Sequence, residues 1–323
     1  MVEEAKPIPL PSPRAIEIRP ERFAFDFEAH RKAAVEKYNR KRDIYRDFAD
    51  TIHDILADAI RTRDLRVNEI QRRAKTVDSF GKKAMTPRKE NSDEPKYRDP
   101  LAEITDLAGV RVITFFPRTV DEVGQCIQRE FEVIEKVDHT ATTQQEERLG
   151  YQSVHYLVRL ADNRRRLPEY QRFDGLIAEV QVRTVMQHAW AEIEHDIRYK
   201  SKSAIAPAIS RRFMTLAGLL EIADREFQAI QEDDANLQAA NRRLIEEKRF
   251  NEVEVTADAL HAFLDWRLGR DDRISDFTYE WTARILRGIG FKNLGQVNDA
   301  IAGLDDDKVS RIAYGTRCGQ VTR

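Results

Sequence analysis

The stretches TDLAGVRVITFF (residues 105–116) and LIAEVQVRT (residues 176–184) predict two half-buried β-strands that each carry one acid. Asp106 and Glu179 would enter a core that is otherwise built from Val, Ile and Phe. A carboxylate in such surroundings loses its hydration and is disfavoured unless a cation or hydrogen bonds replace the water. Two such acids therefore indicate a divalent metal site, and we interpret the chain as a phosphoryl-transfer enzyme.

A basic segment precedes the first of these strands. Residues 61–90 contain ten Lys or Arg against four acids, a surplus that favours an anionic ligand, although a solvated face is the simpler alternative. RVNEIQRRAK (66–75) predicts a short strand, and DSFGKKA (78–84) predicts a helix with Asp78 or Ser79 as its N-cap. The free N–H groups of such a helix start attract phosphate. The residues expected to hold a triphosphate there are Arg73, Lys75, Ser79, Lys82 and Lys83.

The two acids and the basic segment together suffice for phosphoryl transfer. This chemistry mainly needs positioning and charge neutralisation, which two carboxylates, one or two Mg²⁺ ions and a basic cradle provide. Asp106 and Glu179 are the expected metal ligands, and Glu179 is also expected to deprotonate or orient an attacking hydroxyl. In the structural alternative, both acids cap structure or pair with Arg111 and Arg183.

The order of the predicted elements indicates an α+β domain. Apolar residues recur every three or four positions over residues 25–62, as one or two amphipathic helices require. Further helices are expected at 119–130 and 185–200. The strands expected to join residues 66–75 in one sheet are 109–116, 131–137, 151–160 and 176–184. This order predicts a mixed, largely antiparallel sheet flanked by helices.

The strand YQSVHYLVRL (151–160) alternates strictly, which places Tyr151, Ser153 and His155 on one face. Gly150 marks a tight turn before it, after which the ring of Tyr151 could stack on a base. For a single tyrosine, packing in the core is the alternative interpretation.

Composition divides the rest of the chain. Residues 1–24 are expected to be a Pro-rich tail, since residues 1–20 contain five of the eleven prolines. Residues 25–203 would form the catalytic domain. Long helices at 204–248 could mediate homo-oligomers, and residues 249–323 form a small helical module.

Charge and cysteine content exclude several classes of protein. With 41% hydrophobic residues, 34% charged residues and a net charge of −2, the whole-chain charge predicts no nucleic-acid or membrane partner. No run of 18 apolar residues and no secretory leader pattern occur, so nothing targets a membrane. Cys126 and Cys318 lack a paired spacing, which argues against disulfides or zinc and for a reducing cytoplasmic location.

Four ordered motifs resemble one known family. RRAKTVDS, DLAGVRV, GYQSVH and EVQVRT, the last followed by HAWAEIEHDIRYK, are similar to the synthetase domain of the RelA/SpoT family, which makes the alarmone (p)ppGpp. The likeness covers about residues 25–230. It implies a nucleotidyltransferase-like α+β fold that uses Mg²⁺ to transfer the β,γ-diphosphate of ATP to the ribose 3′-hydroxyl of GTP or GDP.

The resemblance also implies how the donor nucleotide is held. Arg73 and Arg111 match the arginines that sandwich adenine. Lys75, Ser79 and Lys83 match the residues that hold the ATP phosphates. The donor half of the site therefore looks complete.

The same resemblance assigns the catalytic and acceptor residues. Asp106 matches the magnesium ligand, and Glu179 matches the glutamate that activates the acceptor hydroxyl. Tyr151 matches the tyrosine that stacks on guanine. The other acceptor-side matches are His155, Gln181 and, where an asparagine is common, His188.

Two features of the sequence leave the identity of the acceptor substrate undecided. Small alarmone synthetases usually carry a lysine where this chain has Glu147, and an acid there would repel 5′-phosphates. Free-standing synthetases normally end after helices equivalent to 204–248, whereas some toxic relatives with an extension pyrophosphorylate the 3′ end of tRNA. One alternative is therefore a tRNA pyrophosphokinase toxin in which residues 249–323 form an autoinhibitory or phage-sensing domain that responds to a protein trigger. The other is a nucleotide-binding regulator without turnover.

Overall fold

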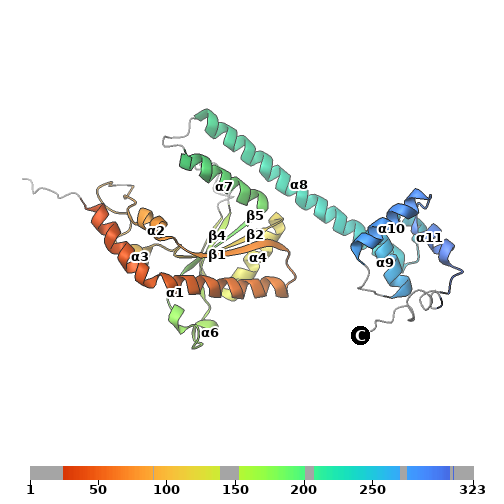
Figure 1. Ribbon diagram of the computed structural model, residues 1–323, viewed down its shortest axis with the longest axis horizontal. Coiled ribbons are helices and arrows are strands. Elements are labelled where there is room, and N and C mark those ends of the chain that lie inside the picture. The colour runs from red at the N-terminus through yellow and green to blue at the C-terminus, as the bar shows by residue number, and fades with distance from the viewer. Residues whose placement is uncertain are drawn as a thin grey trace, which may run out of the picture. The chain divides into compact units, whose positions relative to one another are not determined.

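The computed structural model describes residues 25–89, 91–138, 153–200, 207–269, 275–305 and 308 (Figure 1). The chain divides into two units, which are considered separately. The first ends at Val185, and the second runs from Met186 and also includes residues 116–118.

Five strands form one sheet in the first unit, in the spatial order β1-β2-β5-β4-β3. Their bounds are β1 Val67–Ala74, β2 Ala108–Thr114, β3 Phe131–Asp138, β4 Val154–Leu160 and β5 Ala178–Thr184. β2 and β5 run parallel, and the other three neighbouring pairs are antiparallel. The expected α+β class with a mixed, largely antiparallel sheet is therefore confirmed.

The strands alternate between an apolar face and a polar face. Val110 and Val112 of β2 and Val180 and Val182 of β5 are buried on one face. They form one cluster with the apolar side chains of α1 (Phe27–Thr62), which runs along the sheet (Figure 1). Because successive side chains of a strand point to opposite faces, the residues between these valines lie on the other, polar face.

The helices of the first unit begin at recognisable caps. α1 is one continuous helix, and the side chain of Asp26 accepts a hydrogen bond from the N–H of Ala29 at its start. α2 (Val77–Ala84) is capped by Thr76. The prediction of Asp78 or Ser79 as its N-cap was therefore wrong. Thr76 has the extended backbone that an N-cap needs, and its Oγ1 accepts from the N–H of Ser79. The remaining elements are α3 Pro100–Glu103, α4 Pro117–Glu130, α6 Asp162–Arg165 and the 3₁₀ turn Gln171–Phe173.

The second unit is helical. Its elements are α7 Val185–Lys200, α8 Pro207–Glu246, the 3₁₀ turn Phe250–Glu252, α9 Ala257–Leu268, α10 Asp276–Gly288 and α11 Leu294–Ile301. The end of α8 packs with α9, α10 and α11 around Phe263 and Leu294, and this cluster is distinct from the core of the sheet. The expected C-terminal helical extension is therefore present. No helix in the described ranges has the length and apolar character that crossing a bilayer requires.

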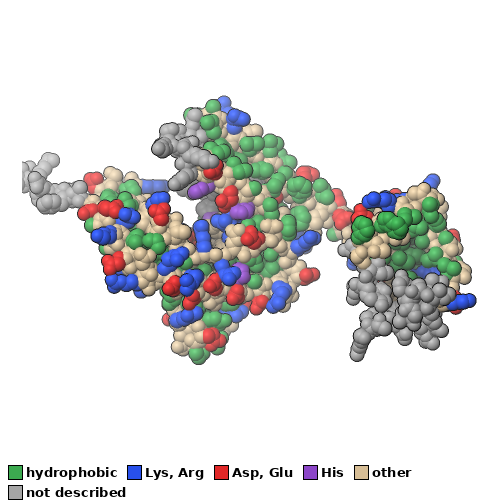
Figure 2. All heavy atoms as spheres, viewed as in Figure 1, with side chains coloured by type: hydrophobic (Ala, Val, Ile, Leu, Met, Phe, Trp, Pro, Cys, Tyr) green, Lys and Arg blue, Asp and Glu red, His purple; other side chains and the backbone are tan. Residues whose placement is uncertain are grey.

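Helix α8 leaves many apolar side chains in contact with solvent. Ile209, Leu216, Phe227, Ile230 and Leu237 are each 45–62% exposed. Figure 2 shows hydrophobic side chains along this helix. The prediction that residues 204–248 mediate oligomers is not tested by this single chain and stays a prediction.

Candidate active site

The polar face of the sheet carries the candidate site. The strand register arranges its side chains in two rows that run across β1, β2, β5 and β4 in that order. The first row is Arg73, Gly109, Glu179 and Leu157. The second row is Gln71, Arg111, Gln181 and His155. Strands that are far apart in the sequence thus bring five of the predicted site residues onto one surface.

A pocket of about 260 Å³ opens over these rows. Its lining residues are Gln71, Arg72, Arg73, Asp106, Gly109, Val110, Arg111, Glu179 and Gln181. Both predicted metal ligands and both predicted adenine-binding arginines therefore line the same cavity.

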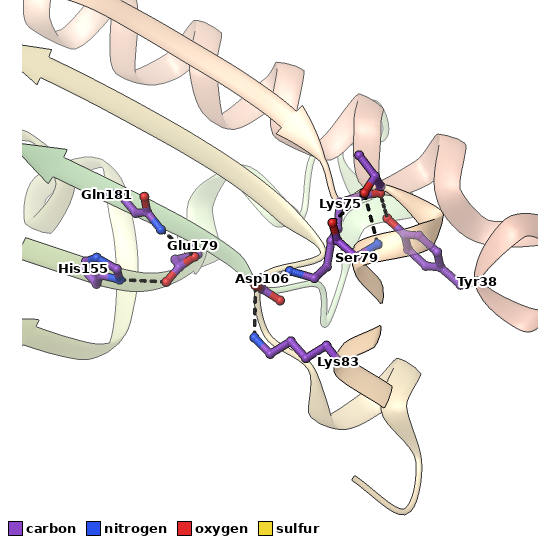
Figure 3. A network of polar contacts seen from close by, with 9 residues as sticks. Tyr38, Lys75, Ser79, Lys83, Asp106, His155, Glu179 and Gln181 are labelled. Carbon is purple, nitrogen blue, oxygen red and sulfur yellow. Dashed lines mark hydrogen bonds and ion pairs between the residues drawn. The ribbon is translucent and has the colours of Figure 1, made fainter. Parts of the chain in front are cut away.

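Asp106 lies just before β2 and is held by two lysines (Figure 3). Its Oδ2 accepts a hydrogen bond from Lys75 Nζ at 2.6 Å and lies 3.0 Å from Lys83 Nζ. Its Oδ1 is buried and has no hydrogen-bond partner within the described ranges. Burial raises the pKa of Asp106, but the two lysines outweigh this effect and hold the pKa below its usual range. The carboxylate is therefore ionised at neutral pH and keeps one oxygen unused.

The backbone of Lys75 is fixed on both sides. Its N–H donates to the carbonyl of Leu107 at 2.9 Å, which ties the end of β1 to the segment carrying Asp106. Its carbonyl accepts from the hydroxyl of Tyr38 at 2.7 Å and from Nε of Arg42 at 3.4 Å. The sequence pattern identified Tyr38 only as a member of the apolar face of a helix, and no sequence signal indicated this contact.

Helix α2 supplies the other two predicted phosphate-binding side chains. Ser79 Oγ accepts a hydrogen bond from Thr76 Oγ1 at 2.7 Å in the first turn. Lys83 lies four residues after Ser79, which puts both on one helix face. Lys82 is paired with Asp78 at 2.8 Å, and its side chain is 67% exposed. Of the two adjacent lysines, only Lys83 therefore reaches Asp106.

Glu179 is held by its neighbours on β4 and β5. Its Oε1 accepts from His155 Nδ1 at 2.9 Å, and its Oε2 accepts from Gln181 Nε2 at 3.1 Å. The hydroxyl of Ser153 lies 2.7 Å from the other ring nitrogen of His155. Burial raises the pKa of Glu179, but the hydrogen bond and charge of His155 outweigh it, so the pKa lies below its usual range despite the repulsion of Asp106.

In the described part of the chain, the partners of the two acids are residues other than Arg111 and Arg183. Asp106 is bound by lysines, and Glu179 is bound by His155 and Gln181, so neither acid depends on Arg111 or Arg183. The expected pairing with these arginines is therefore not found, because the lysines of the strand-to-helix junction turn toward Asp106, while the choice between a structural and a metal-binding role stays open.

The two arginines of the pocket have different surroundings. Arg111 Nη1 donates to Gln71 Oε1 at 3.2 Å, across the register pair of β1 and β2. The side chain of Arg73 makes no hydrogen bond or ion pair with any other residue in the part of the chain that the structure describes. One guanidinium is thus positioned within the sheet, and the other is available to a ligand.

Two predicted acceptor-side residues cannot be placed in the pocket. Tyr151 lies outside the described residues, as does Glu147. His188 lies on α7 in the second unit, where its Nδ1 is 3.7 Å from Glu192 Oε1. Their assigned roles stay predictions.

The donor set of the pocket fits Mg²⁺. Within the described ranges, no group of three or more His, Cys, Asp and Glu side chains could hold a metal ion. Mg²⁺ does not need such a group, since it is usually bound by one or two carboxylates together with substrate phosphates. Asp106, through its unused Oδ1, and Glu179 are the residues that would hold it.

Two curated relatives resemble part of the chain. GTP pyrophosphokinase YjbM of Bacillus subtilis strain 168 is 28% identical over 152 residues, which are 45% of this chain and 67% of the relative. GTP pyrophosphokinase YwaC of the same strain is 25% identical over 132 residues, which are 40% of this chain and 59% of the relative. The similarity therefore spans about two thirds or less of these enzymes.

Solved structures share the fold. Small alarmone synthetase 1 from Bacillus subtilis, bound to its product pppGpp, matches with a TM-score of 0.51 and 22% identity over 62% of this chain and 99% of that chain. Small alarmone synthetase 2 from the same species matches with a TM-score of 0.50 and 20% identity over 61% and 98%.

A family model described as "Region found in RelA / SpoT proteins" matches residues 72–204. This range begins in β1 and includes Arg73, the α2 lysines, both acids and α7. With the shared fold and the two pyrophosphokinase relatives, the match shows that residues 72–204 are a domain of the RelA/SpoT family.

Proposed function

We propose that this chain is an ATP-dependent pyrophosphokinase that transfers the β,γ-diphosphate of ATP to the ribose 3′-hydroxyl of a guanine nucleotide, giving (p)ppGpp. The observation that carries the proposal is the placement of Asp106, between two lysines and in one pocket with Glu179 and an available arginine. The transferase class agrees with the names of both curated relatives, and a structural neighbour is bound to pppGpp.

The donor nucleotide would be bound by the β1–α2 junction. Lys75, Ser79 and Lys83 would supply two positive charges and a hydroxyl for the phosphates, from the end of β1 and from the first and last turns of α2. Arg73 and Arg111 present planar guanidinium groups, which stack well on flat rings such as adenine. This division would put the phosphates beside Asp106 and the base over β1 and β2.

The acceptor hydroxyl would be oriented by Glu179. Both carboxylate oxygens are fixed by hydrogen bonds, and the lowered pKa keeps the group ionised, so it can accept a hydrogen bond from the 3′-hydroxyl. A bond forms between O3′ and the β-phosphorus of ATP, and the bond to the oxygen that bridges the α- and β-phosphates breaks. AMP leaves with that oxygen, and the hydroxyl proton passes to Glu179.

A bound Mg²⁺ would neutralise negative charge on the transferred diphosphate. Lys75 and Lys83 balance the charge of Asp106. The same two lysines would also supply positive charge to phosphate oxygens of the donor.

Incubation of the full chain with γ-labelled ATP and Mg²⁺ tests the proposal directly. The acceptors offered separately are GDP, GTP, AMP-type nucleotides and deacylated tRNA. Label is expected on GDP or GTP. Label on tRNA alone would reject a guanine nucleotide as acceptor and would establish the tRNA pyrophosphokinase instead. No labelled product with any acceptor would favour a regulator without turnover.

The tRNA alternative has one structural point in its favour. The neighbour bound to pppGpp is matched over 99% of its length but covers only 62% of this chain. The C-terminal cluster around Phe263 and Leu294 is a packed module that could regulate the transferase. Toxicity in cells that appears only after removal of residues 249–323 would support autoinhibition by this module.

A further inference from the structure

Helix α10 of the second unit carries two apolar faces. One face, with Tyr279 and Ala283, is buried in the cluster around Phe263 and Leu294. The other face is in contact with solvent, and we call it the outer stripe. Its residues, each 40–73% exposed, are Phe277, Trp281, Ile285 and, at the C-cap, Ile289. A surface helix normally has one apolar stripe and a polar opposite face, so the packing of the module does not explain the outer stripe.

The outer stripe is continuous along the helix. Its members are spaced four residues apart, so each is displaced by about 40° around the axis from the one before. The four side chains therefore fall within about 120° of the helix surface, over a length of about 18 Å. A contiguous apolar patch of this kind is typical of an interaction surface, whereas single exposed apolar residues are not. The helix also lies beyond residues 72–204, the range of the family model.

One edge of the outer stripe is charged, and its charges follow an order. Glu280, Arg284 and Arg287 lie about 60–120° to one side of Trp281, with the acid nearer the start of α10 and both bases nearer its end. Glu280 and Arg284 are 3.5 Å apart, but both are exposed, so solvent screens this pair and either charge can also meet a partner. The other edge carries neutral hydroxyls, those of threonines 278 and 282.

This order of charges is complementary to its own reverse. When two copies of α10 pack antiparallel about a two-fold axis, the same edge of both helices meets with its order reversed. Glu280 of one copy then lies opposite Arg284 and Arg287 of the other, while the two outer stripes face each other. In a parallel pair, the charged edge would instead meet the threonine edge. The antiparallel arrangement is therefore the one that pairs the charges.

We propose that the outer stripe of α10 is a self-association surface, on which α10 of a second copy of this chain packs antiparallel. The second copy covers the rings of Phe277 and Trp281 and brings opposite charges to the charged edge. A nucleic-acid backbone fits less well, because the N–H groups of residues 289, 290 and 291 all donate to carbonyls within the module and are not left for phosphate. The proposal concerns the C-terminal module and does not depend on the transferase activity.

Charge reversal tests the contact between copies. Glu280→Arg makes the charged edge wholly positive, and the double variant Arg284→Glu, Arg287→Glu makes it wholly negative, all at exposed positions. Association is measured by fluorescence energy transfer between copies of the chain labelled at the amino terminus. A micromolar concentration range is chosen, because one pair of helices buries less than the about 1,600 Å² of a standard interface.

The pairings should differ in a defined way. Each charge variant mixed with itself is expected to associate at least about tenfold more weakly than the parent, because like charges then meet along the edge. The two variants mixed with each other are expected to return to within about threefold of the parent, because opposite charges meet again.

Apolar variants test the outer stripe itself. Phe277→Ser and Trp281→Ser are each expected to weaken association at least about tenfold, since buried aromatic residues dominate the energy of such contacts. Leu167→Ser removes an exposed apolar side chain from the first unit and is the matched control, which should associate as the parent does. Thermal unfolding checks that each variant is folded.

Three outcomes would overturn the proposal. The first is a parent chain that stays monomeric, since another segment or another protein would then cover the outer stripe. The second is equal association in all four pairings, since the copies would then meet elsewhere, for example along α8. The third is a mixture of the two charge variants that associates as weakly as either alone. If a serine variant fails to fold, the charge variants decide, because they leave the apolar side chains in place.

Discussion

Lys75 Nζ lies 2.6 Å from Asp106 Oδ2, while Oδ1 of the same carboxylate is buried without a hydrogen-bond partner in the described part of the chain. One oxygen of Asp106 thus binds the lysines, and the other is the oxygen that we propose binds a cation. Under the proposed function, this asymmetry would let a single acid be held in place and still take part in binding a metal–nucleotide complex.

Replacement of Lys75 by Met is expected to reduce kcat/KM for ATP. The substitution removes a charge-assisted hydrogen bond of about 1.5–3 kcal/mol, which corresponds to about a 10- to 100-fold loss. Initial rates over a range of ATP concentrations measure the effect. Lys82→Met is the control, because Lys82 is exposed and paired with Asp78. Equal rates in the two variants would contradict the role of Lys75.

Glu179→Gln is expected to lower transfer at least about 10³-fold, because the neutral amide binds a cation more weakly than a carboxylate and cannot take the hydroxyl proton. The γ-labelled ATP assay with GDP or GTP measures it. Glu169→Gln, on the exposed surface of the same unit, should retain activity. Substantial activity in Glu179→Gln would refute the role assigned to Glu179.

Tyr151→Ala is expected to weaken acceptor binding by about 1–3 kcal/mol if its ring stacks on guanine. The KM for the acceptor should rise while the KM for ATP stays constant. Tyr151 lies outside the described residues, so this prediction depends on the sequence motif alone. An unchanged KM for the acceptor would argue against stacking.

The raised pKa of Tyr38 predicts that the folded chain loses stability at alkaline pH. Burial raises the pKa of its hydroxyl from 10.0 to about 12 in the folded chain. Between these values the unfolded chain loses the proton first, so the free energy of unfolding falls as the pH rises toward 12. Chemical denaturation at several pH values from 8 to about 11.5 measures the slope, which Tyr38→Phe should reduce.

The same variant should also be less stable at neutral pH. It lacks the hydrogen bond from Tyr38 to the carbonyl of Lys75, worth about 1 kcal/mol. An unchanged alkaline slope in Tyr38→Phe would assign the pH dependence to another buried tyrosine, such as Tyr45 or Tyr156, whose pKa values are also raised by burial.

Local patterns made part of the site predictable. The alternation in EVQVRT correctly separated Val180 and Val182 from Glu179 and Gln181, since the period of a strand is two residues. The strand-to-helix junction likewise brought Lys75 and Lys83 to one place, as expected. Both features depend on neighbours in the sequence.

Features set by tertiary structure were not predictable. The parallel pairing of β2 with β5 places Gly109 next to Glu179, and no local signal specifies which strands become neighbours. The cap of α2 was misplaced because Thr76, Asp78 and Ser79 are all good N-cap residues, and backbone conformation decides among them. Ser153 was recognised as sharing a face with His155, but its 2.7 Å contact required coordinates.

The short helix α2 also limits which insertions and deletions the gene could tolerate. Thr76 sets where the helix starts, and Lys83 reaches Asp106 from its last turn. One residue added or removed between them would rotate Lys83 by about 100° and shift it by about 1.5 Å along the axis. Insertions and deletions are thus tolerable in the loops around this helix but not within it. Homologous sequences should therefore keep the spacing between positions 76 and 83 even where the residues between them differ.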